Sequence, residues 1–287
     1  MQSLKGKVAI VTGASRGAGR GIALVLGEAG ATVYVTGRSV REASSRPELL
    51  GTTIDETADQ VTARGGAGIP VRCDHTHDQD VEDLFARVAV EQGRLDILVN
   101  NVWGGYEKYM DEGFVSPFWE QPMWRWDAMF QAGVRAHYSA SRLAARLMIP
   151  QKQGLIINTT FYDRGKYFQP LSYFLAKNTI NQMAYGMGLE LREHHIASIA
   201  LSPGWMRTEA VLAVIAPDGT LTPEEYEQTE SVEYIGRAVV ALASDPDVII
   251  KTGQTWTVGD LAREYGFTDI DGRQVPPFRL PDDILMD

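Results

Sequence analysis

The chain has 287 residues, of which 44% are hydrophobic and 22% charged, a composition typical of a globular protein with ample core. The formal net charge of −10 argues against nucleic acid and anionic lipid as partners. No run approaches the roughly 18 apolar residues that a membrane span needs. The single cysteine, Cys73, excludes an intrachain disulfide. Because a strand-like run already begins at Val8, we see no room for a secretory leader and expect a cytoplasmic protein.

Short β-branched runs alternate with longer helical patterns along the chain, a rhythm that predicts βαβ units around a parallel sheet. Most expected strands are apolar throughout, as strands covered on both faces should be. They are Val8–Thr12, Thr32–Thr36, Gly68–Cys73, Asp96–Asn100, Leu155–Thr159, Ala197–Leu201 and Gln254–Val258. The clearest helical patterns are Gln79–Glu91, Met123–Met148, Ser172–His194 and Val232–Ala243. We therefore expect one α/β domain over residues 1–287, a doubly wound Rossmann-type sheet of about seven strands with a C-terminal tail from about residue 262.

A glycine-rich loop follows the first expected strand and opens a helix. It reads Thr12-Gly-Ala-Ser-Arg-Gly-Ala-Gly19. Glycines there let the backbone turn tightly and approach a pyrophosphate, which binds at the helix N-terminus. Such a loop can also be a flexible turn, but its place between the first strand and the first helix favours a dinucleotide site.

Further motifs follow in order: Cys73-Asp74, Asn100-Asn101, Tyr173-x-x-x-Lys177, and Ser202-Pro203-Gly204 with Thr208. Together with the glycine loop, they make the chain resemble the short-chain dehydrogenase/reductase family from Gly6 to about Gly259. Patterns such as Phe118-Trp119-Glu120 and Pro203-Gly-Trp-x-Arg-Thr-Glu209 also match one subgroup of that family. The resemblance implies that Asp74 binds the adenine amino group, that Asn100 lines the adenosine side and that Thr208 holds the carboxamide. It also assigns cofactor contacts to a further set, which is Gly13, Ser15, Gly17, Gly19, Tyr173, Lys177, Pro203 and Gly204.

Two arginines predict a preference for NADP(H) over NAD(H). The second expected strand ends in Thr36-Gly37-Arg38, where an NAD enzyme would place an acidic residue for the ribose 2′-hydroxyl. A second cation, Arg16, lies within the phosphate loop. Two guanidiniums can bracket a 2′-phosphate, whereas a carboxylate would repel it. Taken singly, each could instead be an ordinary surface arginine.

Tyr173 and Lys177 lie four residues apart on an expected helix, so their side chains project from one face. A phenol has an ordinary pKa of about 10, too high for a base at neutral pH. A nearby ammonium and the positive nicotinium stabilise the phenolate and lower that pKa. In reduction, Tyr173 would give a proton to the carbonyl oxygen as hydride arrives, and Lys177 would also bind the nicotinamide ribose. Such a pair also occurs by chance, but its place after the fifth strand favours catalysis.

Two positions depart from the family pattern near the expected site. The family carries a serine thirteen residues before the tyrosine, and the residue at that distance from Tyr173 is Thr160. Its hydroxyl would polarise the substrate carbonyl. Alternatively, a threonine stands there only because it favours the end of a strand. The family also carries an asparagine seven residues after a tryptophan, and Trp126 is followed at that distance by Gly133. That asparagine is thought to help hold a water linking the lysine to solvent, so the substitution concerns the proton relay.

An aromatic set surrounds the expected site. Trp103 stands where the family usually has glycine, and Tyr162, Phe168 and Trp205 come from other loops, with Phe161 beside them. A pocket lined this way favours small apolar or aromatic substrates. An equally plain interpretation is that several of these side chains pack the core or a subunit contact. His75 and His77 have too few neighbouring ligands for a metal site, so we expect none.

The sequence therefore predicts an NADPH-dependent carbonyl reductase or alcohol dehydrogenase that acts on a small-molecule substrate. Family resemblance implies a homodimer or homotetramer, and Ala140, Ala144, Gly186 and Gly188 would permit close helix approach. Two alternatives remain open. One is a non-catalytic NADP-binding redox sensor, supported by Gly133 and Thr160. The other is a reductase of activated C=C bonds, whose reaction depends less on a hydroxyl that polarises the carbonyl.

Overall fold

The structure, a computed structural model, describes residues 3–43, 52–106, 114–216 and 218–280. Within them, seven parallel strands form one sheet in the order β3-β2-β1-β4-β5-β6-β9. The strands are β1 Val8–Val11, β2 Thr32–Gly37, β3 Ala67–Arg72, β4 Ile97–Asn100, β5 Gly154–Thr159, β6 Ile196–Ser202 and β9 Thr255–Thr257. The order reverses direction between β1 and β4, which confirms the predicted doubly wound sheet.

The central strands are apolar throughout because their two faces enter two different cores. In β1, Ala9 and Val11 pack into one hydrophobic cluster, while Val8 and Ile10 pack into the other. Alternate residues of a strand point to opposite faces, so a sheet covered on both sides needs apolar residues at every position. The edge strand β3 has only one neighbouring strand and stays partly exposed.

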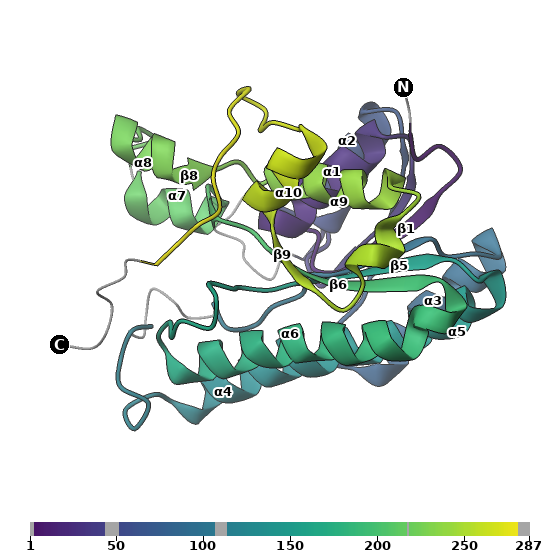
Figure 1. Ribbon diagram of the computed structural model, residues 1–287, viewed down its shortest axis with the longest axis horizontal. Helices are drawn as coiled ribbons and strands as arrows, with labels where there is room; N and C mark the ends of the chain where they lie inside the picture. Colours follow the sequence, from purple (N-terminus) through teal and green to yellow (C-terminus); the bar gives the residue numbers. More distant parts are fainter. Residues whose placement is uncertain (1–2, 44–51, 107–113, 217, 281–287) are drawn as a thin grey trace.

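Helices cover both faces of the sheet (Figure 1). One face carries α1 Gly17–Glu28, α2 Ile54–Ala63, α9 Tyr234–Ser244 and α10 Val258–Tyr265. The other carries α3 Asp78–Gln92, α5 Ala136–Gln151 and α6 Leu171–Leu191. Among the described residues, no helix combines the length and apolar character needed to cross a bilayer.

The long helix expected over Met123–Met148 is interrupted. It consists of α4 (Met123–Ala128), a π-helical turn (Met129–Arg135) and α5. The turn contains the buried Gly133, one of the two departures from the family pattern. Single π-turns inside α-helices are frequent at functional sites. The expected helix Ser172–His194 is α6 followed by a 3₁₀ turn, Arg192–His194, and a second short 3₁₀ turn, Val248–Lys251, precedes β9.

A small lobe and the C-terminal segment flank the carboxyl edge of the sheet (Figure 1). The lobe contains the paired strands β7 (Trp205–Met206) and β8 (Thr229–Glu230), with α7 (Glu209–Ile215) and α8 (Pro223–Gln228). Residues 266–280 pack back onto this same chain. Asp269 is buried and accepts hydrogen bonds from Ser231, and the Tyr234 hydroxyl donates to the Val275 carbonyl at 3.1 Å.

Candidate active site

Four loops at the carboxyl edge of the sheet bring the expected site residues together. The glycine loop joins β1 to α1, and Asn101 begins the loop after β4. Thr160 follows β5, and Pro203 follows β6. The strand order reverses between β1 and β4. The carboxyl ends of the strands at such a reversal are the usual ligand site of doubly wound sheets.

Asn101 holds the glycine loop in place. Its side-chain amide donates to the carbonyls of Thr12 and Gly13 at 3.1 Å each, and its backbone N–H donates to the Thr12 hydroxyl at 2.8 Å. Gly13 has a φ of 63°, and a Cβ on Gly19 would lie 2.3 Å from the Gly13 carbonyl oxygen. Neither position admits a side chain without strain. The sequence analysis indicated Asn101 only through the motif Asn100-Asn101.

The N-terminus of α1 holds an anionic group in this structure. The Gly17 N–H donates to Oε2 of Glu209 at 3.0 Å. A carboxylate oxygen thus stands where an oxygen of a pyrophosphate would bind a helix N-terminus. This contact shows that the loop accepts an anion, so its residues fit a dinucleotide. Glu209 ends the motif Pro203-Gly-Trp-x-Arg-Thr-Glu209, but the sequence did not indicate that it lies against the glycine loop.

Both expected arginines are associated with the end of β2. Arg16 donates from Nη2 to the Ser39 hydroxyl at 3.1 Å, and Ser39 directly follows the exposed Arg38. Burial alone would raise the pKa of Asp74, but hydrogen bonds from Thr76 and the charge of Arg38 hold that pKa below its ordinary value. Arg16 and Asp74 thus each interact with the segment that directly follows β2.

Asn100 lies deeper than the other expected cofactor residues. It is fully buried, and its amide nitrogen donates to the Ser141 hydroxyl at 2.8 Å and to Oδ1 of Asn158 at 2.9 Å. The side chain thus ties β4 to β5 and α5. Its expected place beside adenosine stays a prediction, and these interior partners account for the residue type without it.

The segment after β6 is braced by a residue that the sequence analysis missed. Glu230 is buried against Gly204, where a Cβ would lie 2.6 Å from Oε2. Burial raises the pKa of Glu230 to about 8. Thr208 accepts a hydrogen bond from the Val211 N–H at 3.2 Å and caps α7. The residues expected at the carboxamide thus lie on a segment that packs against a buried carboxyl group.

Tyr173 and Lys177 lie one turn apart on α6, and both side chains are buried. Burial raises the pKa of Tyr173 well above its ordinary value, and the neighbouring Tyr106, whose hydroxyl lies 3.5 Å away, raises it further. Burial lowers the pKa of Lys177 to about 7. The pKa of Tyr173 is thus raised by burial, whereas the sequence analysis expected a nearby ammonium and the nicotinium to lower it. The phenol is protonated, as a proton donor must be before reduction.

Aromatic rings surround Tyr173. Ring centroids lie within 6.3 Å of its own for five residues, which are Trp103, Tyr106, Phe114, Phe161 and Phe168. The expected wall residues Trp103 and Phe168 are thus at the tyrosine. Tyr106 and Phe114 were missed because they lie in a long loop without periodicity, of which 107–113 fall outside the described residues.

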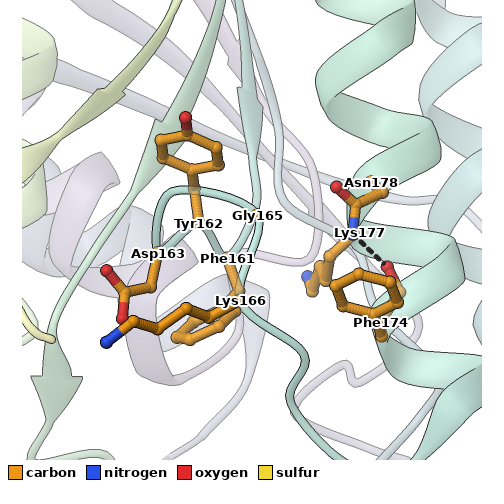
Figure 2. A pocket seen from close by; sticks show the side chains of 8 residues that line it. All are labelled: Phe161, Tyr162, Asp163, Gly165, Lys166, Phe174, Lys177 and Asn178. Atoms are coloured by element: carbon orange, nitrogen blue, oxygen red, sulfur yellow. Dashed lines mark hydrogen bonds between the residues drawn. The ribbon is translucent and has the colours of Figure 1, made fainter. Parts of the chain in front are cut away.

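The other two expected wall residues lie further out. Tyr162 donates its N–H to the Ser202 hydroxyl at 3.0 Å and lines a cavity of about 10 Å³. Figure 2 shows this cavity between the loop 161–166 and α6, where Lys177 and Asn178 line it. It has room for about one water molecule. Trp205 is half-buried in β7.

The Thr160 hydroxyl is buried and bonded within the chain. Oγ1 donates to the backbone carbonyl of Lys177 at 3.1 Å, which joins the end of β5 to α6. A hydroxyl has one hydrogen to donate. It can polarise a substrate carbonyl only after it leaves this helix carbonyl.

The C-terminal segment closes one side of the site. The Phe278 ring lies 6.1 Å from the Phe161 ring, and the Leu280 N–H donates to Oδ2 of Asp163 at 2.7 Å. Lys166 in turn donates to the Leu280 carbonyl at 3.0 Å. Sequence alone gave no reason to place this tail against the loop after β5.

No group of three potential metal ligands occurs among the described residues. His75 is buried and bonded to the Thr36 hydroxyl at 2.8 Å. Burial lowers the pKa of His75 to about 4, so the side chain is a neutral part of the interior.

The profile of the short chain dehydrogenase family matches residues 7–217. The chain belongs to this family. It is 39% identical to "Dehydrogenase/reductase SDR family member 1" of Mus musculus over 285 residues, which cover 96% of this chain and 87% of the relative. This similarity confirms the family and the subgroup indicated by the motifs.

Solved structures agree with the fold. A short chain dehydrogenase from Mycobacterium thermoresistibile superposes with a TM-score of 0.80 at 27% identity, covering 99% of this chain and 96% of the other. A metagenomic short-chain oxidoreductase in complex with NADP has a TM-score of 0.67 at 26% identity, covering 89% and 97%. The predicted Rossmann-type architecture and oxidoreductase family are thus confirmed.

Proposed function

We propose that this protein reduces the carbonyl group of a small apolar or aromatic substrate with NADPH and oxidises the corresponding alcohol in the reverse direction. The observation that carries the proposal is the protonated Tyr173 hydroxyl, set among aromatic rings one helical turn from Lys177. Bound NADPH supplies the hydride. Tyr173 gives its proton to the carbonyl oxygen, and the Lys177 ammonium favours the phenolate that remains.

The choice of NADP(H) rests on Arg16 and Arg38. Arg16 donates to Ser39, and Arg38 directly follows β2, where this sequence has no carboxylate to accept a ribose hydroxyl. The NADP complex of the metagenomic structural neighbour supports the same choice. Gly17 and its loop would hold the pyrophosphate, and Thr208 with Pro203 and Gly204 would hold the carboxamide side.

One observation favours a second reaction, the reduction of an activated C=C bond. The Thr160 hydroxyl is bonded to the Lys177 carbonyl and is not free to polarise a substrate carbonyl. C=C reduction depends less on that hydroxyl, whereas it still uses hydride and a proton donor. A redox sensor that binds NADP(H) without turnover is the remaining alternative.

A screen of NADPH consumption over ketones, aldehydes, quinones and enones tests these functions, with Tyr173→Phe as the blank. We expect ketones or aldehydes to be reduced, and Tyr173→Phe to lose turnover while it still binds NADPH. Turnover of enones alone would favour the second reaction, and binding without turnover would favour the sensor. Substantial activity of Tyr173→Phe on a confirmed substrate would refute the mechanism.

Nucleotide titrations test the cofactor separately. A charge-assisted hydrogen bond contributes about 1.5–3 kcal/mol at most, so Arg38→Ala should weaken NADPH binding by roughly tenfold or more. NADH binding should change little, because NADH lacks the 2′-phosphate. Equal affinities of the wild-type protein for the two nucleotides would show that Arg38 does not face the phosphate.

A homodimer or homotetramer is also proposed, through the outer faces of α5 and α6. Tyr138, Tyr185 and Leu189 are 56%, 52% and 55% exposed there, a large apolar surface for a solvated helix pair. The small residues Ala140 and Ala144 are already buried inside this chain, so they do not contribute to that surface. Sedimentation measurements on the wild-type protein and on Tyr185→Glu would test the contact. The expected cytoplasmic location stays a prediction.

A further inference from the structure

The indole of Trp103 contacts both members of the catalytic pair. The Lys177 ammonium lies 3.7 Å from the centroid of the indole, and the Tyr173 ring meets it edge-on at 5.6 Å and 84°. A cation over an aromatic face within about 6 Å is attracted by the negative face of the ring, and tryptophan gives the strongest such contact. Trp103 therefore does more than narrow the substrate space.

Gly133 is matched to this ring. A Cβ at Gly133 would lie 2.6 Å from Cζ3 and 2.7 Å from Cε3 of Trp103. These atoms belong to a rigid fused ring that cannot yield at one end, and Gly133 itself is buried in the π-helical turn Met129–Arg135. Glycine costs about 1 kcal/mol relative to alanine inside a helix, so its presence needs a reason. The indole supplies that reason, because any side chain at 133 would displace it.

We propose that Trp103 and Gly133 act as one unit that positions the Lys177 ammonium beside Tyr173, in place of the asparagine that the family carries at the position of Gly133. The departures from the family pattern at Trp103 and Gly133 are then a single compensated change. This inference rests on the proposed function of the pair. Trp103 is a positioning residue here, since it acts through Lys177.

The surroundings of Lys177 explain why the ammonium needs such support. Burial favours the neutral amine and lowers the pKa of Lys177 to about 7. The indole face opposes that effect, because it stabilises only the charged form. Titratable groups around Lys177 come from several elements. Tyr173 lies on α6, His137 lies on α5, and Tyr106 contacts Tyr173 from the loop after β4. Tyr162, Asp163 and Lys166, on the loop after β5, line a small cavity together with Lys177. The charge of Lys177 is one reason that the pKa of His137 is lowered, after burial.

The first test measures the Lys177 ammonium without turnover. Lysines labelled with ¹³C at Cε are titrated by NMR, with Lys177→Arg to assign the signal. Trp103→Leu keeps an apolar side chain but removes the aromatic face. It should lower the pKa of Lys177 by about one, which decreases the protonated fraction roughly tenfold above that pKa. Trp103→Phe keeps an aromatic face and should restore most of the difference.

An unchanged pKa of Lys177 in Trp103→Leu would overturn the proposal, because a substrate-wall role would alter only the KM of the substrate. The pKa of Lys177 could fall as expected although neither the wild type nor any variant reduces a carbonyl. In that case the positioning role stands and the proposed function fails. In an active enzyme, Trp103→Leu should lower kcat for reduction more than it raises KM for NADPH.

The second test measures the match between ring and glycine by thermal unfolding. Gly133→Ala should lower the Tm by roughly 5 °C in the wild-type background, because the new methyl overpacks the indole. In the Trp103→Gly background the same substitution should cost nothing or raise the Tm slightly. Val90→Ala on α3 is the control, since that side chain is 87% exposed and its replacement should not lower the Tm in either background. An equal decrease from Gly133→Ala in both backgrounds would overturn the pairing.

Discussion

Replacing Thr160 separates two roles of one hydroxyl, that of a structural link and that of a carbonyl-polarising donor. Thr160→Val keeps the shape of the side chain and removes Oγ1, which donates to the Lys177 carbonyl at 3.1 Å. Loss of that hydrogen bond should decrease the free energy of unfolding by about 1 kcal/mol. If the hydroxyl also stabilises developing negative charge on the substrate, kcat should fall about a hundredfold, or about 2.7 kcal/mol in activation free energy.

Urea unfolding and steady-state rates on one confirmed ketone measure the two effects separately. Thr160→Ser keeps the oxygen, loses one methyl, and should retain most of the activity. Thr159→Ala is the matched control, because neighbouring residues of an extended strand point to opposite faces, so that change should affect stability more than rate. Normal kcat in Thr160→Val, together with the expected loss of stability, would refute the catalytic role. A crippling effect of Thr159→Ala would show that the thirteen-residue count chose the wrong threonine.

Three further changes address the cofactor loop, the interior and the tail. Glu209→Gln should tighten NADPH binding roughly fivefold in a fluorescence titration, because the carboxylate on the Gly17 N–H would repel the pyrophosphate; weaker binding would contradict this. Burial and the charge of Lys177 lower the pKa of His137 to about 3, so below pH 6.5 only the unfolded state takes up the proton. His137 should therefore remove about 1.4 kcal/mol of stability per pH unit as pH decreases from 6.5, and buried His75 should remove as much again down to about pH 4. Urea unfolding of His137→Gln should show about half the wild-type slope, and an equally steep loss would argue against His137. Phe278→Ala should raise the substrate KM roughly threefold to tenfold, since it removes a ring contact with Phe161. An equal loss of NADPH affinity would show that the tail does not border the substrate specifically.

Local patterns in the sequence predicted most of the fold. All seven strands of the sheet appear within one or two residues of the expected positions, because a strand covered on both faces must be apolar at successive residues. The glycine loop and the Tyr173–Lys177 pair could also be predicted, because the residues of each lie within one turn or one helix at a fixed spacing in the sequence. The shorter elements α7, α8, β7 and β8 were not predicted, as they carry no sustained period.

What only the tertiary structure decided is how residues far apart in the chain meet. The sequence showed Trp103 and Gly133 as two separate departures, and the packing shows that a side chain at one excludes the ring at the other. Likewise, Glu209 reaches Gly17 across 192 residues, and the Thr160 hydroxyl turns to the carbonyl of Lys177. Periodicity reports which face of an element is buried, whereas these contacts depend on the distance and angle between elements, which the packing of the whole domain fixes.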